Sequence, residues 1–378
     1  MPRPDTSALA RRQTRIRQTL ETLKLDALVV ICASNIRYLT NHVGSAGVLV
    51  MARDGVHLLA DFRYIESIRL LQESPAACPG LRVWDVPASY DEALVSCLAE
   101  LGVTAVGFES TQVTVSRFDW WRRTAEARAL ALVFRPTERV VERQRIVKDA
   151  AEVATLRDAA ARLSPVAESA FAAARPGMTE RQLAAVLEAA LREAGYERPA
   201  FDTIVASGPN SALPHYRAGG RVMARGDLLV LDFGGVLDGY CSDLTRTVAV
   251  GPSTPEARRI HAAVLAAQQA AIAAVRPGAE TTAVDAAARR VLQDCGLGDA
   301  FGPGTGHGLG LDIHEEPRIT RQRADLPSIP LEPGMVFTIE PGAYLPGFGG
   351  VRIEDDVLVT EDGCDVLTSV PRQLLSVG

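Results

Sequence analysis

The sequence predicts an α/β domain at the N-terminus, followed by an α+β domain that contains an internal pseudo-two-fold repeat. Short apolar runs alternate with helical patterns through the first third of the chain, as in an α/β domain. Further along, an Arg-Pro-Gly sequence that opens a helical pattern occurs twice. With 378 residues, 47% of them hydrophobic, the chain is long enough for two domains with complete cores.

The N-terminal domain is expected to comprise residues 1–140. An amphipathic helix opens it, because Leu9, Ile16 and Leu20 recur at helical spacing. The pair Asp54-Gly55 between two apolar runs is a strong signal for a β-hairpin. Strands are expected at residues 26–31, 47–51, 56–60, 82–86 and 105–109, and helices at residues 64–72 and 90–101.

The second domain, residues 141–378, carries the internal repeat. Arg175-Pro176-Gly177 opens a helical pattern that ends at Gly195. Arg276-Pro277-Gly278 opens a second one that ends at Gly296, so that all landmarks recur at an offset of 101 residues. Proline and glycine fit the start of each helix, and the closing glycines fit C-caps. A duplicated domain is therefore expected, with ligands bound where its halves meet.

Composition excludes several classes of protein. The formal net charge of -6, with acidic and basic residues interleaved, argues against nucleic-acid binding. No apolar stretch approaches the length of a membrane span, so that we expect a cytoplasmic protein that binds no membrane. The six cysteines form no CxxC pair, which favours buried free thiols over a disulfide framework or a zinc site.

Two aspartates flank a glycine-rich turn in the second domain. Asp232 ends the apolar run of residues 228–231, and Asp243 follows eleven residues later. The intervening glycines can reverse the chain, so that both carboxylates can point from neighbouring strands into one cleft. Taken alone, aspartates around a hairpin are more often solvated turn residues.

Two glutamates repeat this arrangement further along. Glu340 and Glu354 each follow an alternating apolar run, and the glycine- and proline-rich residues 343–350 separate them. Alternation alone would also allow both side chains to face solvent. Two hairpins of the same kind make that alternative weaker. Buried carboxylates are costly unless they are paired or bind metal.

Three histidines stand in unusual surroundings. His307 lies among four glycines in residues 304–310, a segment predicted to be a loop that lets backbone approach a ligand. A phosphate loop is the alternative, but the lysine and the ending of a P-loop are missing. His314 and His215 are further candidates for metal ligation, proton transfer or hydrogen bonding to an oxyanion. For the remaining histidines we expect structural or surface roles; they are His42, His57 and His261.

These segments together resemble one family. LDFGG, SDLTRT, GTGHGLGLDIHEEP, TIEPGAYLPGFGGVRIEDD and the PHY segment resemble the pita-bread metallopeptidases that act on Xaa-Pro bonds, the Xaa-Pro dipeptidases (prolidases) and Xaa-Pro aminopeptidases. Residues 35–40 and 60–64 resemble their N-terminal domain. The resemblance implies a creatinase/prolidase-type α/β domain before a pita-bread catalytic domain. Methionine aminopeptidases normally lack the first domain, and creatinase has lost the metal ligands.

The resemblance also implies the site. Two divalent ions, with Mn2+ expected first and Co2+ or Zn2+ as alternatives, would acidify a bridging water to hydroxide and polarise the scissile carbonyl. Glu340 would be general base as well as ligand. His215 and His314 would contact the substrate and the oxyanion or carry the proton, and Arg352 would orient carboxylates. The implied metal ligands are Asp232, Asp243, His307, Glu340 and Glu354.

The expected function is hydrolysis of the Xaa-Pro bond in proline-containing dipeptides or short peptides. Three arginines after His314 could clamp a free carboxylate and so favour a dipeptidase, although such arginines are more often solvated; they are Arg318, Arg321 and Arg323. The alternatives are an Xaa-Pro aminopeptidase that acts on longer peptides and, less favoured, a non-catalytic binding module.

Two further expectations concern the substrate pocket and the assembly. The pyrrolidine ring of the substrate needs an apolar pocket. Its candidate walls are Phe233, Tyr240, Tyr344 and the His215-Tyr216 segment. The resemblance implies a homodimer, in which residues 35–42 would be a loop that closes the cleft.

Overall fold

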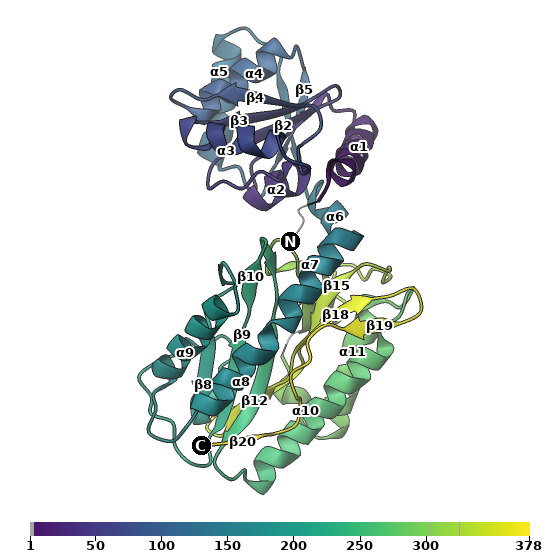
Figure 1. Cartoon of the computed structure of the whole chain (residues 1–378). Coiled ribbons are helices and arrows are strands. Elements are labelled where there is room, and N and C mark those ends of the chain that lie inside the picture. The colour runs from purple at the N-terminus through teal and green to yellow at the C-terminus, as the bar shows by residue number, and fades with distance from the viewer. Residues whose placement is uncertain (1–3, 303, 325) are drawn as a thin grey trace. The chain divides into compact units, whose positions relative to one another are not determined.

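The computed structural model describes residues 4–302, 304–324 and 326–378, and it divides into two compact units, Met1–Arg145 and Ile146–Gly378. The sequence prediction had put the division at residue 140, between the last strand of the first unit and the short helix that ends it. Figure 1 shows the elements in chain order. None of the helices in the described ranges is long and apolar enough to cross a membrane.

The first unit is an α/β domain, as predicted. Its sheet has the order β4-β3-β2-β1-β5-β6, in which β1 runs parallel to β5 and antiparallel to β2. The strands are β1 (Ala27–Val30), β2 (Val48–Ala52), β3 (Val56–Ala60), β4 (Leu81–Asp85), β5 (Ala105–Glu109) and β6 (Val133–Thr137). The helices are α1 (Thr6–Leu23), α2 (Ala33–Thr40), α3 (Phe62–Gln72), α4 (Tyr90–Glu100), α5 (Val115–Ala127) and α6 (Glu142–Arg145).

Helix α2 lies where the sequence predicted a loop, so this prediction is wrong. The carboxylate of Glu109 accepts hydrogen bonds from the backbone N–H groups of Ile31 and of the N-cap residue Cys32, and so fixes the chain where it enters this helix. Asn41 adopts a left-handed conformation with φ of 60° and ends the helix. The contact that favours the helix therefore comes from a residue far away in the sequence.

The second unit contains the predicted duplication. Helices α9 and α11 begin after Gly177 and Gly278, whose φ angles are 87° and 77°, and they end before Gly195 and Gly296, at 89° and 71°. Each first glycine donates its N–H to a backbone carbonyl, Gly177 to Met223 at 2.9 Å and Gly278 to Leu331 at 2.8 Å. The helices are α7 (Ala150–Ala161), α8 (Leu163–Ala173), α9 (Glu180–Glu193), α10 (Pro255–Ala274) and α11 (Thr281–Asp294).

Two larger sheets of this unit have the orders β20-β12-β9-β8 and β14-β13-β15-β18-β19. Their strands are β8 (Ile204–Ser207), β9 (Leu228–Phe233), β12 (Leu244–Val250), β20 (Ser376–Val377), β13 (Gly304–Gly308), β14 (Glu315–Thr320), β15 (Val336–Ile339), β18 (Asp355–Val359) and β19 (Cys364–Val366). Smaller ribbons and turns are β7 (Arg198–Pro199), β10 (Gly235–Leu237), β11 (Tyr240–Cys241), β16 (Gly342–Leu345), β17 (Gly349–Arg352), η1 (Gly208–Ala212) and η2 (Gly298–Ala300).

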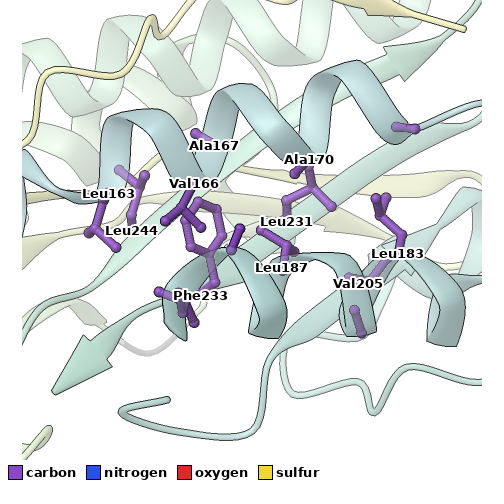
Figure 2. Packing of buried hydrophobic residues seen from close by; sticks show 14 of the residues in the cluster. Leu163, Val166, Ala167, Ala170, Leu183, Leu187, Val205, Leu231, Phe233 and Leu244 are labelled. Atoms are coloured by element: carbon purple, nitrogen blue, oxygen red, sulfur yellow. The ribbon is translucent and has the colours of Figure 1, made fainter. Parts of the chain in front are cut away.

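Each half has its own hydrophobic core. Leu163, Val166 and Leu187 of the helices pack against Leu231 and Phe233 of β9, as Figure 2 shows. Helices α10 and α11 pack in the same way against strands that include β15, β17 and β18. The two cores hold the sheets whose strand ends carry the predicted site.

The six cysteines and the three remaining histidines differ in how deeply they are buried. The cysteines are free thiols, as predicted, but Cys295 is exposed and only three are buried, namely Cys78, Cys97 and Cys241. His42, His57 and His261 are all buried, which agrees with a structural role and not with a surface one.

Candidate metal centre

Asp232 and Asp243 lie on one face of an antiparallel strand pair. Asp232 is in β9 directly opposite Thr245 of β12, and Asp243 precedes Thr245 by two residues. Opposite residues, and residues two apart, point to the same face of a sheet. The exposed fractions of the two aspartates are 7% and 4%. The glycine-rich hairpin of β10 and β11 therefore does bring both carboxylates together, and neither is a solvated turn residue.

Glu340 and Glu354 occupy equivalent positions in the second half. Ile339 at the end of β15 pairs with Asp355 at the start of β18, so the two glutamates continue the same register. Glu354 is 2% exposed, whereas the side chain of Glu340 is 25% exposed. The backbone N–H of Glu354 donates to the carbonyl of Thr245 at 3.1 Å. This hydrogen bond joins the two halves at the site.

His307 belongs to strand β13, and the predicted loop is therefore wrong. The glycines around it allow close packing of neighbouring strands and not of a ligand. A Cβ added at Gly306 would lie 1.9 Å from the carbonyl oxygen of Thr338, and one at Gly308 would lie 2.1 Å from that of Glu316. The strand is thereby held against both β14 and β15.

The imidazole of His307 is oriented by its own backbone neighbour. Its Nδ1 lies 3.1 Å from the carbonyl oxygen of Gly308, which can only accept, so Nδ1 carries the proton. The lone pair of Nε2 then faces the carboxylates, 3.4 Å from Glu340 Oε1 and 3.7 Å from Asp243 Oδ2. Burial lowers the pKa of His307 to about 4, which keeps the ring neutral at neutral pH.

The chemistry of this donor set fits divalent cations. One ligand atom each of Asp243, His307 and Glu354 lies within 4.8 Å of the others. Within the described ranges, Oδ1 of Asp232 and Oδ1 of Asp243 are buried without a hydrogen-bond partner. Burial, followed by repulsion among the carboxylates, raises the pKa of Asp243 and Glu354 well above the usual range. A cation would satisfy the unpartnered oxygens and remove the repulsion.

Two threonines that the sequence interpretation overlooked orient these carboxylates. Thr245 Oγ1 donates to Glu354 Oε2 at 2.6 Å, and Thr338 Oγ1 donates to Glu340 Oε1 at 3.2 Å. Each threonine lies two residues from a carboxylate of its own half, on the same strand face. The alternation in SDLTRT and FTIE was the signal that would have identified them.

Arg352 lies beside Asp232 and is buried. Its Nη2 donates to Asp232 Oδ2, its Nε donates to Thr245 Oγ1 at 3.0 Å, and its Nη1 donates to the hydroxyl of Tyr344 at 2.8 Å. Nη1 also reaches the carbonyl oxygen of Pro214 at 3.3 Å. One guanidinium thus connects a carboxylate of the first half with a hairpin of the second.

His314 and His215 are exposed and flank the carboxylates. The rings of His314 and His307 meet edge to face with centroids 4.4 Å apart. Partial burial of the ring, followed by the neighbouring His307, lowers the pKa of His314 to about 4. Positive charge on either His314 or His215 would lower the pKa of Glu340, so both imidazoles lie close to that carboxylate. The segment before His215 is held through Pro214 by Arg352.

Most of the expected pocket walls have other partners. Phe233 is fully buried in the core, Tyr240 donates its hydroxyl to Glu152 at 3.0 Å, and Tyr216 donates to Glu180 at 2.8 Å. Tyr344, through Arg352, and His215 are the wall candidates that stay beside the carboxylates.

Among the three arginines, Arg318 pairs directly with His307 across β13 and β14, so both side chains share one face. Arg321 and Arg323 are exposed. Of the three, Arg318 is therefore the one that the strand pairing brings to the site.

Known proteins resemble this chain over most of its length. The model of metallopeptidase family M24 matches residues 154–361, and the model of the creatinase/prolidase N-terminal domain matches residues 12–147. An Xaa-Pro dipeptidase of Pyrococcus furiosus is 42% identical over 242 residues, which cover 64% of this chain and 68% of that protein.

Two solved structures extend the similarity to both units. An Xaa-Pro dipeptidase from Bacillus anthracis has a TM-score of 0.91 at 34% identity and covers 98% of this chain and 100% of its own. An X-Pro aminopeptidase from Thermotoga maritima has a TM-score of 0.83 at 33% identity, with coverages of 97% and 99%. The pita-bread fold with a creatinase-type N-terminal domain is thereby confirmed.

Proposed function

The chain belongs to metallopeptidase family M24, and on that premise we propose that this hydrolase cleaves the Xaa-Pro bond of dipeptides. The observation that carries the proposal is the convergence of Asp243, His307 and Glu354 at the junction of the two halves. Buried acceptors without partners surround this point, which favours a bound cation over a merely structural cluster.

We propose that five residues hold the cations. When bound, two divalent ions would supply an acidified water and polarisation of the scissile carbonyl. Oxygen-rich ligation favours Mn2+, with Co2+ or Zn2+ as alternatives. The proposed ligands are Asp232, Asp243, His307, Glu340 and Glu354, while Arg352 and the two threonines fix the orientation of the carboxylates.

Hydrolysis adds a water oxygen to the carbonyl carbon before proline, breaks the C–N bond and leaves a proton on the proline nitrogen. Glu340 is suited to accept the proton from water and deliver it to nitrogen, because it is the most exposed of the four carboxylates. Burial raises the pKa of Glu340 above its usual range. His314 is neutral at pH 7 and can donate one N–H to the developing oxyanion, and His215 lies on the exposed side to contact the substrate.

Arg318 supports a dipeptidase over an aminopeptidase. Its guanidinium shares the face of β13 and β14 with His307 and lowers the pKa of His314, so it lies near both rings. A free carboxylate on the proline of a dipeptide could pair with it. The similarity to an X-Pro aminopeptidase keeps action on longer peptides as the second candidate.

Substrate length distinguishes these functions. Protein loaded with Mn2+ should hydrolyse Ala-Pro faster than Ala-Pro-Pro-Ala. Faster cleavage of the tetrapeptide would establish the aminopeptidase, and no cleavage of either peptide would favour a non-catalytic binding module.

Three further proposals rest on the family resemblance. We propose manganese as the native metal, a homodimer as the working assembly and the cytoplasm as the location, with neither nucleic acid nor membrane as a partner. Metal analysis of the purified protein tests the first of these, and light scattering coupled to size-exclusion chromatography tests the second.

A further inference from the structure

A buried ion pair lies just outside the proposed active site. Lys148 is one of two lysines among 40 basic residues, the other being Lys24. Its ammonium lies 3.3 Å from Oε2 of Glu315, and their side chains are only 1% and 7% exposed. The backbone N–H of Lys148 donates to the carbonyl of Gly334 at 2.9 Å, which fixes the chain just before α7. The lysine is therefore anchored at both its backbone and its side chain.

The partner carboxylate organises the segment that carries His314. Oε1 of Glu315 accepts the backbone N–H of Asp312 at 3.0 Å, which turns residues 312–315 around this carboxylate. A Cβ at Gly310 would lie 2.7 Å from the same oxygen, so the carboxylate also packs against the start of the segment. The carbonyl of Gly310 accepts the N–H of Cys241 at 2.7 Å. His314 lies within this turn, directly before Glu315.

Stability alone is a poor explanation for this pair. Removing two charges from water costs several kcal/mol for each ion, and apolar residues of similar volume often stabilise a protein equally well. A buried pair is more easily explained where it imposes a particular geometry. Here the geometry is that of the His314 imidazole, which meets the ring of His307 with centroids 4.4 Å apart.

We propose that Lys148 is a positioning residue for His314. Its ammonium holds the Glu315 carboxylate, the carboxylate holds the turn at Asp312, and the turn directs the imidazole towards the scissile bond. This inference rests on the catalytic role of His314 in the proposed function. In the described part of the chain, the ammonium of Lys148 contacts Glu315 and the carbonyl of Ile146, and neither is a proposed metal ligand.

A double-mutant cycle tests the link. Lys148→Met should lower kcat for Ala-Pro by about 100-fold, the effect of an imidazole displaced by about 1 Å, with a much smaller change in KM. In a His314→Ala background the same substitution should have no further effect on kcat, because the group that it positions is absent. Lys148→Arg restores the charge and a donor and should recover part of the activity.

The control is Arg162→Met, at an ion pair that is more exposed than that of Lys148. Arg162 pairs with Asp158 at 2.7 Å and donates to the carbonyl of Ala194, within the same unit but without a link to His314. This variant should lose thermal stability while kcat of the folded protein stays unchanged. If Lys148→Met does not fold, Glu315→Gln tests the same link, since it keeps the side-chain length but removes the charge.

The outcomes separate this inference from the function on which it rests. An unchanged kcat in His314→Ala would show that the catalytic role of His314 is wrong. If His314→Ala lowers kcat strongly and Lys148→Met lowers kcat by the same factor with or without His314, the positioning role alone is overturned. A loss of stability without a change in kcat for Lys148→Met, or for Glu315→Gln in its place, would likewise overturn it.

Discussion

Removal of one carboxylate should make the metal-free protein more stable while it abolishes activity. The perturbation is Asp243→Asn, which keeps the shape of the side chain and removes its charge. Oδ1 of Asp243 is among the buried oxygens without a partner, so the substitution breaks no hydrogen bond of that atom.

The magnitude follows from the distance between carboxylates. Ligand atoms of Asp243 and Glu354 lie within 4.8 Å, where two unit charges repel by about 3.5 kcal/mol at an effective dielectric constant of about 20. Partial protonation reduces this repulsion, because the pKa values of both carboxyl groups are raised. We expect the free energy of unfolding of metal-free Asp243→Asn to be about 1–3 kcal/mol larger than that of the wild type, which for a unit of this size corresponds to a rise in Tm of about 2–6 °C.

The pH dependence has a definite sign. Because the folded pKa of Asp243 lies above its unfolded value, the metal-free protein loses stability as the pH rises from the unfolded pKa through the folded one. The wild-type Tm in the presence of a chelator should therefore fall as the pH rises above about 4, the ordinary pKa of an aspartate. The Tm of Asp243→Asn should fall less over the same pH range. The difference in Tm between the variant and the wild type should therefore be greatest at pH 8.

Thermal unfolding in a chelating agent, followed at several pH values, measures the effect. Added Mn2+ should raise the wild-type Tm more than that of the variant, and kcat of the variant should be at least about 100-fold lower. Asp158→Asn, which only breaks the pair with Arg162, is the control and should gain nothing. A chelated Asp243→Asn protein with a lower Tm than the wild type at pH 8 would refute the argument from charge repulsion.

Three other variants test separate parts of the site. Arg352→Lys keeps the charge but cannot reach Asp232 and its other partners together, so steady-state kinetics should show a loss in kcat of about 10- to 100-fold. Arg318→Met should raise KM for Ala-Pro by about tenfold or more and leave KM for Ala-Pro-Pro-Ala unchanged; equal effects on both would exclude carboxylate recognition. Gly306→Ala places a Cβ 1.9 Å from a carbonyl oxygen and should weaken Mn2+ binding in calorimetry, whereas Gly302→Ala, with open space, should not.

Local signals in the sequence predicted the elements that depend on local chemistry. The apolar runs identified β3 and β5 to the residue, and the glycines at 195 and 296 identified the ends of α9 and α11. Helix α2 was missed because the chain at its start is fixed by Glu109, which is distant in sequence. The strand at His307 was missed because its glycines serve contacts with β14 and β15 that the sequence does not reveal.

The site was predictable to a similar extent. Hairpin spacing and the resemblance to known peptidases predicted a metal site at the carboxylates, and the structure brings Asp243, His307 and Glu354 together. Contacts across the halves could not be derived, since the hydrogen bonds from Thr245 to Glu354 and from Lys148 to Glu315 join residues that are 109 and 167 positions apart. Their geometry depends on the packing of the two cores and not on any local pattern.

The hydrogen bond between the backbones of Glu354 and Thr245 marks a seam between the two halves of the second unit. A cation shared by Asp243, His307 and Glu354 would bridge that seam and act as a non-covalent cross-link between segments that are distant in the chain. Cross-links that close long loops restrict the unfolded chain most strongly. Neither half alone would then capture the ion tightly, and metal uptake would report that both halves have folded and docked. The ion would thus couple two separate cores into one cooperative unit.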